Sequence, residues 1–545
     1  MNQAVARLSA APGSGVAGPG AAATGPHEPR KPRRRRRRPW SRDSPRPLRR
    51  PVPWTPYDTV VFAIVAILGA VTRFAGLSHP TDNGTPVFDE KHYVPQTWQI
   101  LRSTDPSFTG RVIGGIEDDP GFGLVVHPPV AKQVMSVGQW LLGYSPLGWR
   151  LMSAVFGVVT LLLLMDLVRR IAAVPLATLL VGLYGLFDGV LFVSSRVGML
   201  DMIQTGFVVA AAWALFVDRD RMAVRLLEWR ATAGDGLRYG PYLSWRWWRL
   251  AAGVFLGLAL GVKWSGVYYI AAFGLLTVFL DVADRRRAGV RRPVVGALRL
   301  DVTPALRDIV LVPLIVYALS WRSWFAQETS VYRHLPADQL DTGLPSSVTA
   351  MLPDALARFI HYQRGVLEFH SELTTSGGHH HPWESKPWEW LWSGRPMLYY
   401  SAEGTCMGGH DCRAWQMLFG TPPIWWLLVP VMLWALWRWI GRRDRRFALP
   451  CTGFIASWLP WAIAYDRQMY FFYATALIPF VLMAMAVVAA DLAGWTWRGR
   501  RIGLGFVVAH LALVIAAFAF WAPIMAGIML PEETFNLRFW LPSWT

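Results

Sequence analysis

The stretch YDTVVFAIVAILGAVTRFAGLSHPTDNGTPVFDEKHY, residues 57–93, begins as a long apolar run and ends in a cluster of ionisable side chains. The apolar run is long enough to cross a bilayer, and Asp89, Glu90, Lys91 and His92 follow soon after its end. Adjacent carboxylates at a membrane surface are costly to keep there, so such a cluster is a functional-site hypothesis. On spacing alone, it is an equally good interpretation that the two carboxylates cap a short interfacial helix.

The composition is that of a membrane protein. Of the 545 residues, 53% are hydrophobic and only 17% are charged, and 30 are Trp. A membrane-spanning helix needs about 20 apolar residues, and we predict about eleven such helices in an all-α polytopic fold. The predicted spans are 58–77, 147–168, 174–194, 198–217, 250–264, 266–282, 308–326, 422–440, 448–465, 471–491 and 502–522.

The formal net charge of +18 comes from Arg and Lys concentrated in short connections between apolar runs. A positive-inside topology explains this pattern better than nucleic-acid binding, for which the sequence has no helix-turn-helix, zinc-finger or basic-zipper pattern. The N-terminus and the basic connections then face the cytoplasm, and eleven spans leave the C-terminal segment 523–545 outside. The connections 78–146 and 327–421 become two long outer loops, so any chemistry faces the periplasm or the cell exterior.

Residues 1–56 are predicted to form a disordered basic cytoplasmic tail ahead of a membrane domain over 57–522. The tail is rich in Ala, Gly and Pro and contains RKPRRRRRR at 30–38. Such a segment cannot bury enough apolar surface to fold. Its arginines are expected to contact anionic lipid of the inner leaflet.

Several cations gather at the predicted outer ends of the spans, on the same side as the acidic pair. Arg150 lies in LGWRLMSAVFG, Lys263 lies in LGVKWSGVYY, and HPPVAK brings His127 and Lys132 close to the membrane. Cations at this depth make a site for a phosphate at the lipid headgroup level. Arg150 or Lys263 alone is also explained as an interfacial anchor that snorkels. The same ambiguity attaches to Arg196 and Asp201, in SSRVGMLDM.

The second outer loop contains HHHPWESKPWEWLWSGRP, residues 379–396. Three consecutive histidines do not easily face one ion, so a structural or substrate-contacting loop is preferred to a metal site. The tryptophans either stack on a sugar or peptide, or lie at the interface as an aromatic belt. For Cys406 and Cys412, in CMGGHDC, a disulfide and free thiols are both open, and a metal site with His410 is a further alternative.

Taken together, these motifs resemble the dolichyl-phosphate-mannose protein mannosyltransferase family in its bacterial form. The matching elements follow the family order over most of residues 57–491: FDE, HPPVAK, Arg150, SSRVGMLD, VKWSG, EFHSELT, HPWESKPWEW, RPMLYY, GTPPIWW and WLPWAIAYDRQMYFFYATALIPF. The resemblance implies a GT-C type membrane fold, a polyprenyl-phosphate mannose donor, and Ser or Thr acceptors on exported proteins. It implies that Asp89 is the catalytic carboxylate and Glu90 its acidic neighbour, which orients the acceptor or holds a cation. The chain lacks the MIR domains that eukaryotic members carry in the second outer loop.

A sugar on a lipid phosphate already has a good leaving group, so catalysis needs a base for the acceptor hydroxyl and positive charge for the departing phosphate. We expect Asp89 to be that base and the transfer to invert the anomeric carbon. Arg150 and Lys263 are expected to hold the phosphate, with His127 and Lys132 as further candidates. The expected contacts of the second outer loop with acceptor or sugar are His381, Trp383, Glu384, Trp388 and Arg395.

This scheme requires no metal or other cofactor, and Mg²⁺ or Mn²⁺ between acidic loop residues and phosphate is the alternative. Two other functions remain open. One is sugar transfer to a glycolipid or cell-wall polysaccharide by the same chemistry, and the other is a lipid-linked sugar carrier, which the long outer loops disfavour. The export machinery is an expected partner, because an unfolded exported chain presents its hydroxyls most readily.

Overall fold

A computed structural model of the chain describes residues 48, 50–102, 126–232, 238–243, 245–326, 330–406 and 409–545. The chain divides into two compact units, Met1–Ser44 and Pro45–Thr545, and the features below all lie in the second. The prediction of a disordered tail falls largely on residues 1–47, which lie outside the described residues. Residues 103–125 of the first outer loop also lie outside them.

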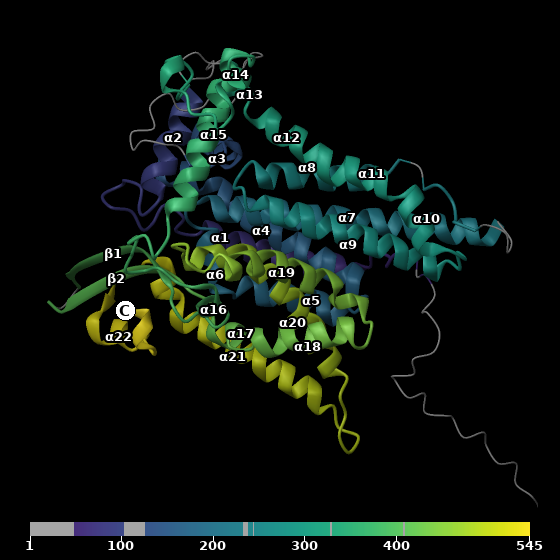
Figure 1. Ribbon diagram of the computed structural model, residues 1–545. Coiled ribbons are helices and arrows are strands. Elements are labelled where there is room, and N and C mark those ends of the chain that lie inside the picture. The colour runs from purple at the N-terminus through teal and green to yellow at the C-terminus, as the bar shows by residue number, and fades with distance from the viewer. Residues whose placement is uncertain are drawn as a thin grey trace, which may run out of the picture. The chain divides into compact units, whose positions relative to one another are not determined.

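Each of the eleven predicted spans coincides with a helical segment (Figure 1). These segments are α1 (Pro56–Phe74), α4 (Pro146–Ala172), α5 (Pro175–Leu186) with α6 (Gly189–Ser194), α7 (Leu200–Thr232), α8 (Trp247–Leu260), α9 (Gly266–Arg287), α11 (Val302–Leu306) continuing through a π-helical turn (Arg307–Leu311) into α12 (Val312–Ser320), α17 (Pro422–Trp425) with α18 (Leu428–Ile440), α19 (Ala448–Ile463), α20 (Ile478–Ala493) and α21 (Ile502–Ala526). Among the described residues, seven helices are both long and apolar enough to cross a bilayer. The predicted helical, polytopic membrane fold is confirmed.

The first turns of the helices explain where the spans begin. At α1, the Thr55 hydroxyl accepts from the Asp58 backbone N–H while the Asp58 carboxylate accepts from the Thr55 N–H, and Pro56 occupies the first turn. At α4, Ser145 caps the Gly148 N–H. The far end is less regular, because α7 continues about 15 residues past the predicted end of its span at 217. Hydropathy marks the lipid-facing length of a helix and not its last residue.

Buried ion pairs join the helices at the basic end of the bundle. Arg246, at the start of α8, donates to Asp218 of α7 at 2.5 Å and to Asp281 of α9 at 2.8 Å. Arg249 of α8 donates to Asp308 of the π-helical turn at 2.9 Å. All five side chains are less than 10% exposed. Removing one partner from such a buried pair is strongly destabilising, because a charge is left uncompensated.

The opposite end of the bundle carries the outer loops (Figure 1). A small antiparallel sheet, which the sequence did not predict, consists of β1 (Met397–Thr405), β2 (Asp411–Leu418) and β3 (Leu530–Pro531), in the order β1-β2-β3. Cys406 and Cys412 form a disulfide at the end of the β1–β2 hairpin. The remaining helices are α2 (Glu90–Arg102), α3 (Val130–Leu142), α10 (Pro293–Leu300), α13 (Arg322–Ala326), α14 (Ser346–Thr349), α15 (Asp354–Glu372), α16 (Pro387–Trp390) and α22 (Glu532–Asn536).

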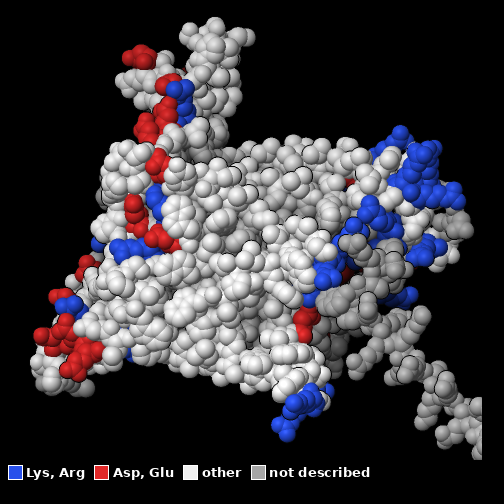
Figure 2. Space-filling view, turned by 60° about the horizontal axis from the view of Figure 1, so that its bottom comes forward, with Lys and Arg blue, Asp and Glu red and all other residues white. Residues whose placement is uncertain are grey.

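Charge is strongly segregated along the bundle. On the face seen in Figure 2, Lys and Arg gather at one end, Asp and Glu lie mainly at the other, and the surface between them is almost uncharged. Large apolar side chains such as Ile64, Leu275 and Leu433 are exposed on the helices. An exposed apolar band of this kind is suited to lipid. The chain is therefore a multi-pass membrane protein.

Candidate active site

Glu90, the first residue of α2, is held in a buried clamp. Its Oε1 accepts from Arg150 Nε at 2.7 Å, and its Oε2 accepts from Arg150 Nη2 at 2.8 Å. The backbone N–H groups of Gly198 and Val87 donate to the same carboxylate at 2.6 and 3.1 Å. The remaining Arg150 nitrogen, Nη1, donates to the Leu77 carbonyl at 3.2 Å. The bidentate pair therefore joins the first outer loop to α4.

This clamp changes two of the expectations. The Arg150 side chain is 0% exposed and the Glu90 side chain is 1% exposed. Arg150 therefore does not face a donor phosphate in this structure, because its guanidinium is engaged by Glu90 and a carbonyl. Glu90 has no free carboxylate oxygen with which to bind an acceptor or a cation. What the pair does is fix the short turn that carries Asp89.

Asp89 lies just before α2, on a turn of unusual backbone geometry. The preceding residue, Phe88, has φ = 48°, which non-glycine residues rarely adopt. Two backbone N–H groups from the first turn of α2 donate to the Asp89 carbonyl, and the side chain is half-buried. Burial raises the pKa of the Asp89 carboxyl from 3.8 to about 6, with Lys263 opposing the rise and Asp201 adding to it.

Lys263 and Asp201, the two charges that act on this carboxyl, form an ion pair with each other. Lys263 Nζ donates to Asp201 Oδ1 at 2.8 Å, and it lies 5.3 Å from the centre of the Phe472 ring. The other oxygen, Asp201 Oδ2, is buried and has no hydrogen-bond partner among the described residues. The site thus brings together two carboxylates and one ammonium group. The expectation that Lys263 lies beside the acidic loop agrees with this geometry.

A pair of stacked histidines connects the two outer loops. The rings of His127 and His370 lie 5.6 Å apart. His370 Nε2 donates to the Val126 carbonyl at 3.1 Å, and its Nδ1 accepts from Arg467 Nη2 at 2.9 Å. A carbonyl only accepts and a guanidinium only donates, so His370 is the neutral tautomer with its proton on Nε2. Burial and the Arg467 charge lower the pKa of His370 to about 4.

Three of the four candidates for phosphate binding share one electrostatic neighbourhood. Burial lowers the pKa of His127 well below its ordinary value, and Lys263, Lys132 and Arg467 lower it further. Lys132 is buried, and its Nζ donates to Gln96 Oε1 at 3.2 Å. A neutral His127 imidazole can donate a hydrogen bond to a phosphate oxygen without adding a further positive charge beside the lysines. Arg150, in its separate clamp, is the candidate that the structure sets apart.

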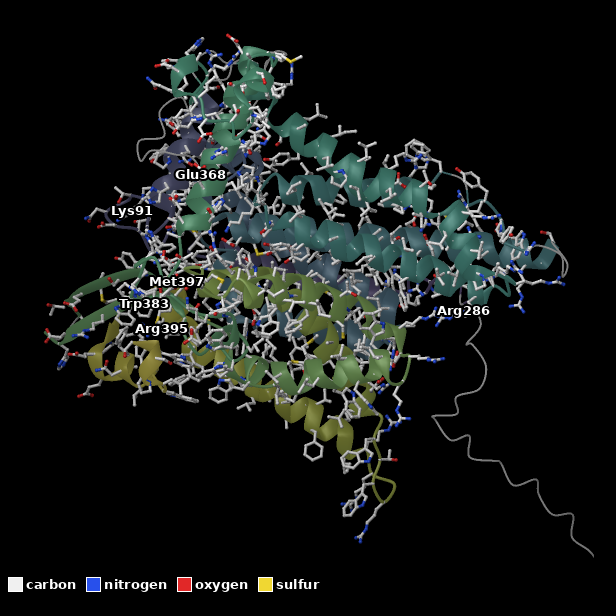
Figure 3. The ribbon with its side chains drawn as sticks, viewed as in Figure 1. Lys91, Arg286, Glu368, Trp383, Arg395 and Met397 are labelled. Carbon is white, nitrogen blue, oxygen red and sulfur yellow. A yellow bond between two sulfur atoms is a disulfide. The ribbon has the colours of Figure 1, made fainter. Side chains whose placement is uncertain are left out.

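Two of the candidate residues in the second outer loop have structural contacts. The Arg395 guanidinium lies 5.0 Å from the Trp383 ring centre and donates to the Ser543 carbonyl at 2.6 Å. These contacts tie the loop to the C-terminal segment. Trp388 is 52% exposed, as an interfacial belt residue would be. Figure 3 places Trp383, Arg395 and Met397 at the same end of the bundle as Lys91, and Arg286 at the opposite end.

His381 and Glu384 are linked to the Asp89 site through Tyr470. The His381 ring packs edge-on against Tyr470, with centres 5.4 Å apart. Burial raises the pKa of Tyr470 to about 12, and the charges of both Asp89 and Glu384 contribute to the rise. Glu384 Oε2 is buried and has no partner among the described residues. Of the five candidates in this loop, these two are the ones that the structure brings toward Asp89.

A cavity of about 400 Å³ lies beside the turn that carries Asp89. Its walls are the first outer loop, through Asp82, Val87, Phe88 and Lys91, and residues 398–402 of β1. The Phe88 and Tyr399 rings stack with centres 5.0 Å apart. The two neighbours of the Asp89–Glu90 pair, Phe88 and Lys91, therefore both border an open space.

The sequence left Asp201 ambiguous and gave no role to three further residues that the structure brings to the site. These three are His370, Arg467 and Tyr399. The available signal was a polar residue at the end of an apolar run, which is the position of Asp201 and Arg467, but many such residues are only anchors. Arg196 is an example, since its guanidinium donates to four backbone carbonyls at the C-terminal end of α1.

Comparison with known proteins gives a consistent result. Residues 124–284 match the model of the family described as dolichyl-phosphate-mannose-protein mannosyltransferase. Residues 355–544 match the C-terminal four TMM region of protein-O-mannosyltransferase. A polyprenol-phosphate-mannose–protein mannosyltransferase of Corynebacterium glutamicum is 51% identical over 496 residues, covering 90% of this chain and 94% of that protein. A protein of the same name from Mycobacterium tuberculosis is 43% identical over 514 residues, covering 92% and 95%.

The fold is also found among solved structures. The S. cerevisiae protein O-mannosyltransferase Pmt1-Pmt2 complex bound to the sugar donor matches with a TM-score of 0.67 and 15% identity, over 90% of this chain and 93% of that chain. At that identity the likeness concerns the fold alone, and it agrees with the expected GT-C type. On the family models and the extent of the sequence identity, the chain belongs to the protein O-mannosyltransferase family of membrane glycosyltransferases.

Proposed function

We propose that this chain transfers mannose from polyprenyl-phosphate mannose to Ser or Thr hydroxyls of exported proteins, with inversion at the anomeric carbon. The names of the relatives from C. glutamicum and M. tuberculosis, which contain both polyprenol-phosphate-mannose and protein, support this choice of donor and acceptor. One observation carries the proposal for this chain's own residues. Asp89, with a pKa raised to about 6, lies in the field of the Lys263 ammonium at the outer-loop end of the bundle.

Asp89 accepts the proton of the acceptor hydroxyl while that oxygen attacks the anomeric carbon from the face opposite the phosphate. A carboxyl with a pKa of about 6 is mostly ionised at neutral pH and is still a stronger base than an ordinary aspartate. One carboxylate suffices, because the phosphate leaves without a general acid. This differs from a retaining glycosidase, which needs two carboxylates.

The departing phosphate is stabilised by positive charge that the chain itself supplies. Lys263 is a cation whose charge acts on Asp89, and Lys263, Lys132 and Arg467 all act on His127. Fixed cations in a partly dehydrated site stabilise developing negative charge far better than water does. The Glu90–Arg150 clamp contributes indirectly, because it fixes the position of the turn on which Asp89 lies.

The active site faces the extracytoplasmic side in this proposal, with the N-terminus inside and the C-terminus outside. The larger clusters of Lys and Arg at the opposite end of the bundle support this orientation through the positive-inside rule (Figure 2). Acceptor chains then arrive from the export machinery, before folding hides their hydroxyls. We also propose that no metal ion is needed, since Lys263 supplies positive charge beside Asp89. Activity abolished by a chelator and restored by Mg²⁺ or Mn²⁺ would overturn that part.

The experiment is transfer of labelled mannose from polyprenyl-phosphate mannose to a Thr-rich peptide in membranes that contain the protein. Asp89→Asn is expected to lose about 10²- to 10⁴-fold in rate, the usual worth of a general base. The matched control is Asp354→Asn on α15, where the aspartate side chain is 90% exposed. Label found only in glycolipid would favour the alternative acceptor, and full activity of Asp89→Asn would remove the residue from its role.

A further inference from the structure

β1 is an edge strand. The sheet order is β1-β2-β3, so β1 pairs with β2 on one side, and no strand of the described chain pairs with its other side. In Figure 1, β1 lies on the side of the hairpin away from α22. The nearby backbone groups of Val87 and Phe88 bond within their own turn. An unpaired edge presents a row of N–H and C=O groups that is ready to pair with another extended chain.

The cavity beside the turn that carries Asp89 lies along this edge, and it is lined by Val87, Phe88 and Lys91 of that turn rather than by Asp89 itself. Its β1 wall consists of five consecutive residues, 398–402. Successive side chains of a strand point to opposite faces, so a cavity on one face would be lined by alternate residues. The β1–β2 register shifts between Leu398 and Tyr400, so a bulge breaks this alternation at Tyr399. Beyond the bulge, Tyr400, Ser401 and Ala402 are consecutive and all line the cavity, which indicates that it borders the backbone edge there. Its volume of about 400 Å³ is within the range of ligand pockets.

We propose that the acceptor polypeptide binds in this cavity as an additional strand, paired through its main chain with residues 398–402 of β1. The inference rests on the proposed function, since it needs a protein acceptor. Five residues of extended chain span roughly 17 Å. The opposite wall carries Phe88 and Lys91, on either side of the Asp89–Glu90 pair. A strand bound between these walls therefore passes the turn of the base, and one of its alternating side chains can offer a hydroxyl there.

The chemistry of the walls fits an acceptor of variable sequence. Main-chain hydrogen bonds do not read side chains, so strand addition accepts many sequences and requires only an extended, unfolded segment. Ser401 and Ala402 are small and leave room for the incoming chain. The charged residues of the cavity, Asp82 and Lys91, have opposite signs, so neither acidic nor basic acceptors are selected. Proline is excluded from the acceptor positions whose backbone N–H must donate to β1, because proline has no N–H.

The test uses the unmodified protein and a series of Thr acceptor peptides, each N-methylated at one backbone nitrogen. Adjacent N–H groups of a strand point to opposite sides. N-methylation is therefore expected to raise the acceptor KM about tenfold at alternate positions around the Thr and to have little effect between them, with kcat nearly constant. Equal effects at all positions, or none, would overturn the strand-addition proposal. Absence of label in the unmethylated peptide would instead contradict the proposed function.

A matched pair of variants gives an independent measurement. Ala402→Phe fills the cavity and is expected to raise the acceptor KM about tenfold or more, with the donor KM unchanged. Thr405→Phe lies on the same strand beyond the cavity lining and is expected to leave both unchanged. Equal effects of the two variants on the acceptor KM would contradict the proposal. A second copy of the chain could also occupy the β1 edge. In that case the N-methylation effects would show no alternation, and the protein would self-associate in a way that Ala402→Phe abolishes. This combined result would overturn the strand-addition proposal.

Discussion

Mannose transfer at pH 5 is expected to be about tenfold slower than at pH 7, because Asp89 must be ionised to accept a proton. Burial is the largest cause that raises the pKa of this carboxyl from 3.8 to about 6. At a pKa of about 6, the ionised fraction is about 90% at pH 7 and about 10% at pH 5. An aspartate at its ordinary pKa stays about 94% ionised at pH 5, so its activity would hardly change over this range.

The assay is kcat/KM for the peptide acceptor between pH 4.5 and 8, with each sample returned to pH 7 to exclude irreversible inactivation. Lys263 opposes the rise in pKa and Asp201 adds to it. Asp201→Asn is therefore expected to move the acidic midpoint to lower pH and Lys263→Met to higher pH. A wild-type profile that stays flat down to pH 5, or shifts of the opposite sign in the two variants, would refute the titration of Asp89.

Three further predictions concern single side chains. Because its folded-state pKa is raised, ionised Asp89 destabilises the protein by about 3 kcal/mol at pH 7, and this penalty fades as the pH falls through 6 toward 4. Asp89→Asn should accordingly melt at a higher temperature than wild type at pH 7 but not at pH 4, and equal melting temperatures at pH 7 would contradict the buried charge. Arg150→Met leaves the Glu90 carboxylate unpaired and is expected to lower the free energy of unfolding by about 3–5 kcal/mol. In thermal unfolding, the double variant Arg150→Met with Glu90→Gln should be more stable than Arg150→Met alone. Additive losses of stability in the double variant would argue against the clamp. Lys263→Met should lower kcat while acceptor KM stays constant, and Lys263→Arg should retain part of the rate; Arg286→Met, at the other end of the bundle (Figure 3), is the control, and an equal loss there would point to a general defect.

The helices could be predicted from the sequence because lipid imposes a simple rule. Every backbone polar group must be satisfied within a spanning segment, so apolar runs of sufficient length become helices. The sheet had no comparable signal. The segment of β1, MLYYSAEGT, is an apolar run followed by small and polar residues, so its sequence lacks the apolar–polar alternation by which half-buried strands are usually found. The third strand, β3, pairs with β2 and lies more than a hundred residues after it, near the C-terminus.

The candidate site was predicted in composition more than in arrangement. Asp89 and Lys263 could be placed on the same side of the membrane, because each lies near the predicted outer end of a spanning helix. The roles of Glu90 and Arg150 could not, because whether a cation faces substrate or a buried carboxylate depends on side-chain direction. Glu90 and Arg150 are 60 residues apart in sequence and joined at 2.7 Å. Neighbouring acidic residues thus have different environments, and only the folded turn distinguishes them.

The buried arginines at the basic end have two successive roles in the orientation proposed for this chain. While the chain is being inserted, Arg249 precedes both of its aspartate partners, so it is an unneutralised charge that helps to hold its connection in the cytoplasm. Arg246 can already pair with Asp218 of α7, and it gains its second partner later. Once α9 and the π-helical turn arrive, Asp281 and Asp308 bind them. The charges that help to determine orientation during synthesis thereby become partners in buried ion pairs between helices. The potential at the surface of this end of the mature protein is then set by exposed arginines such as Arg443 and Arg501.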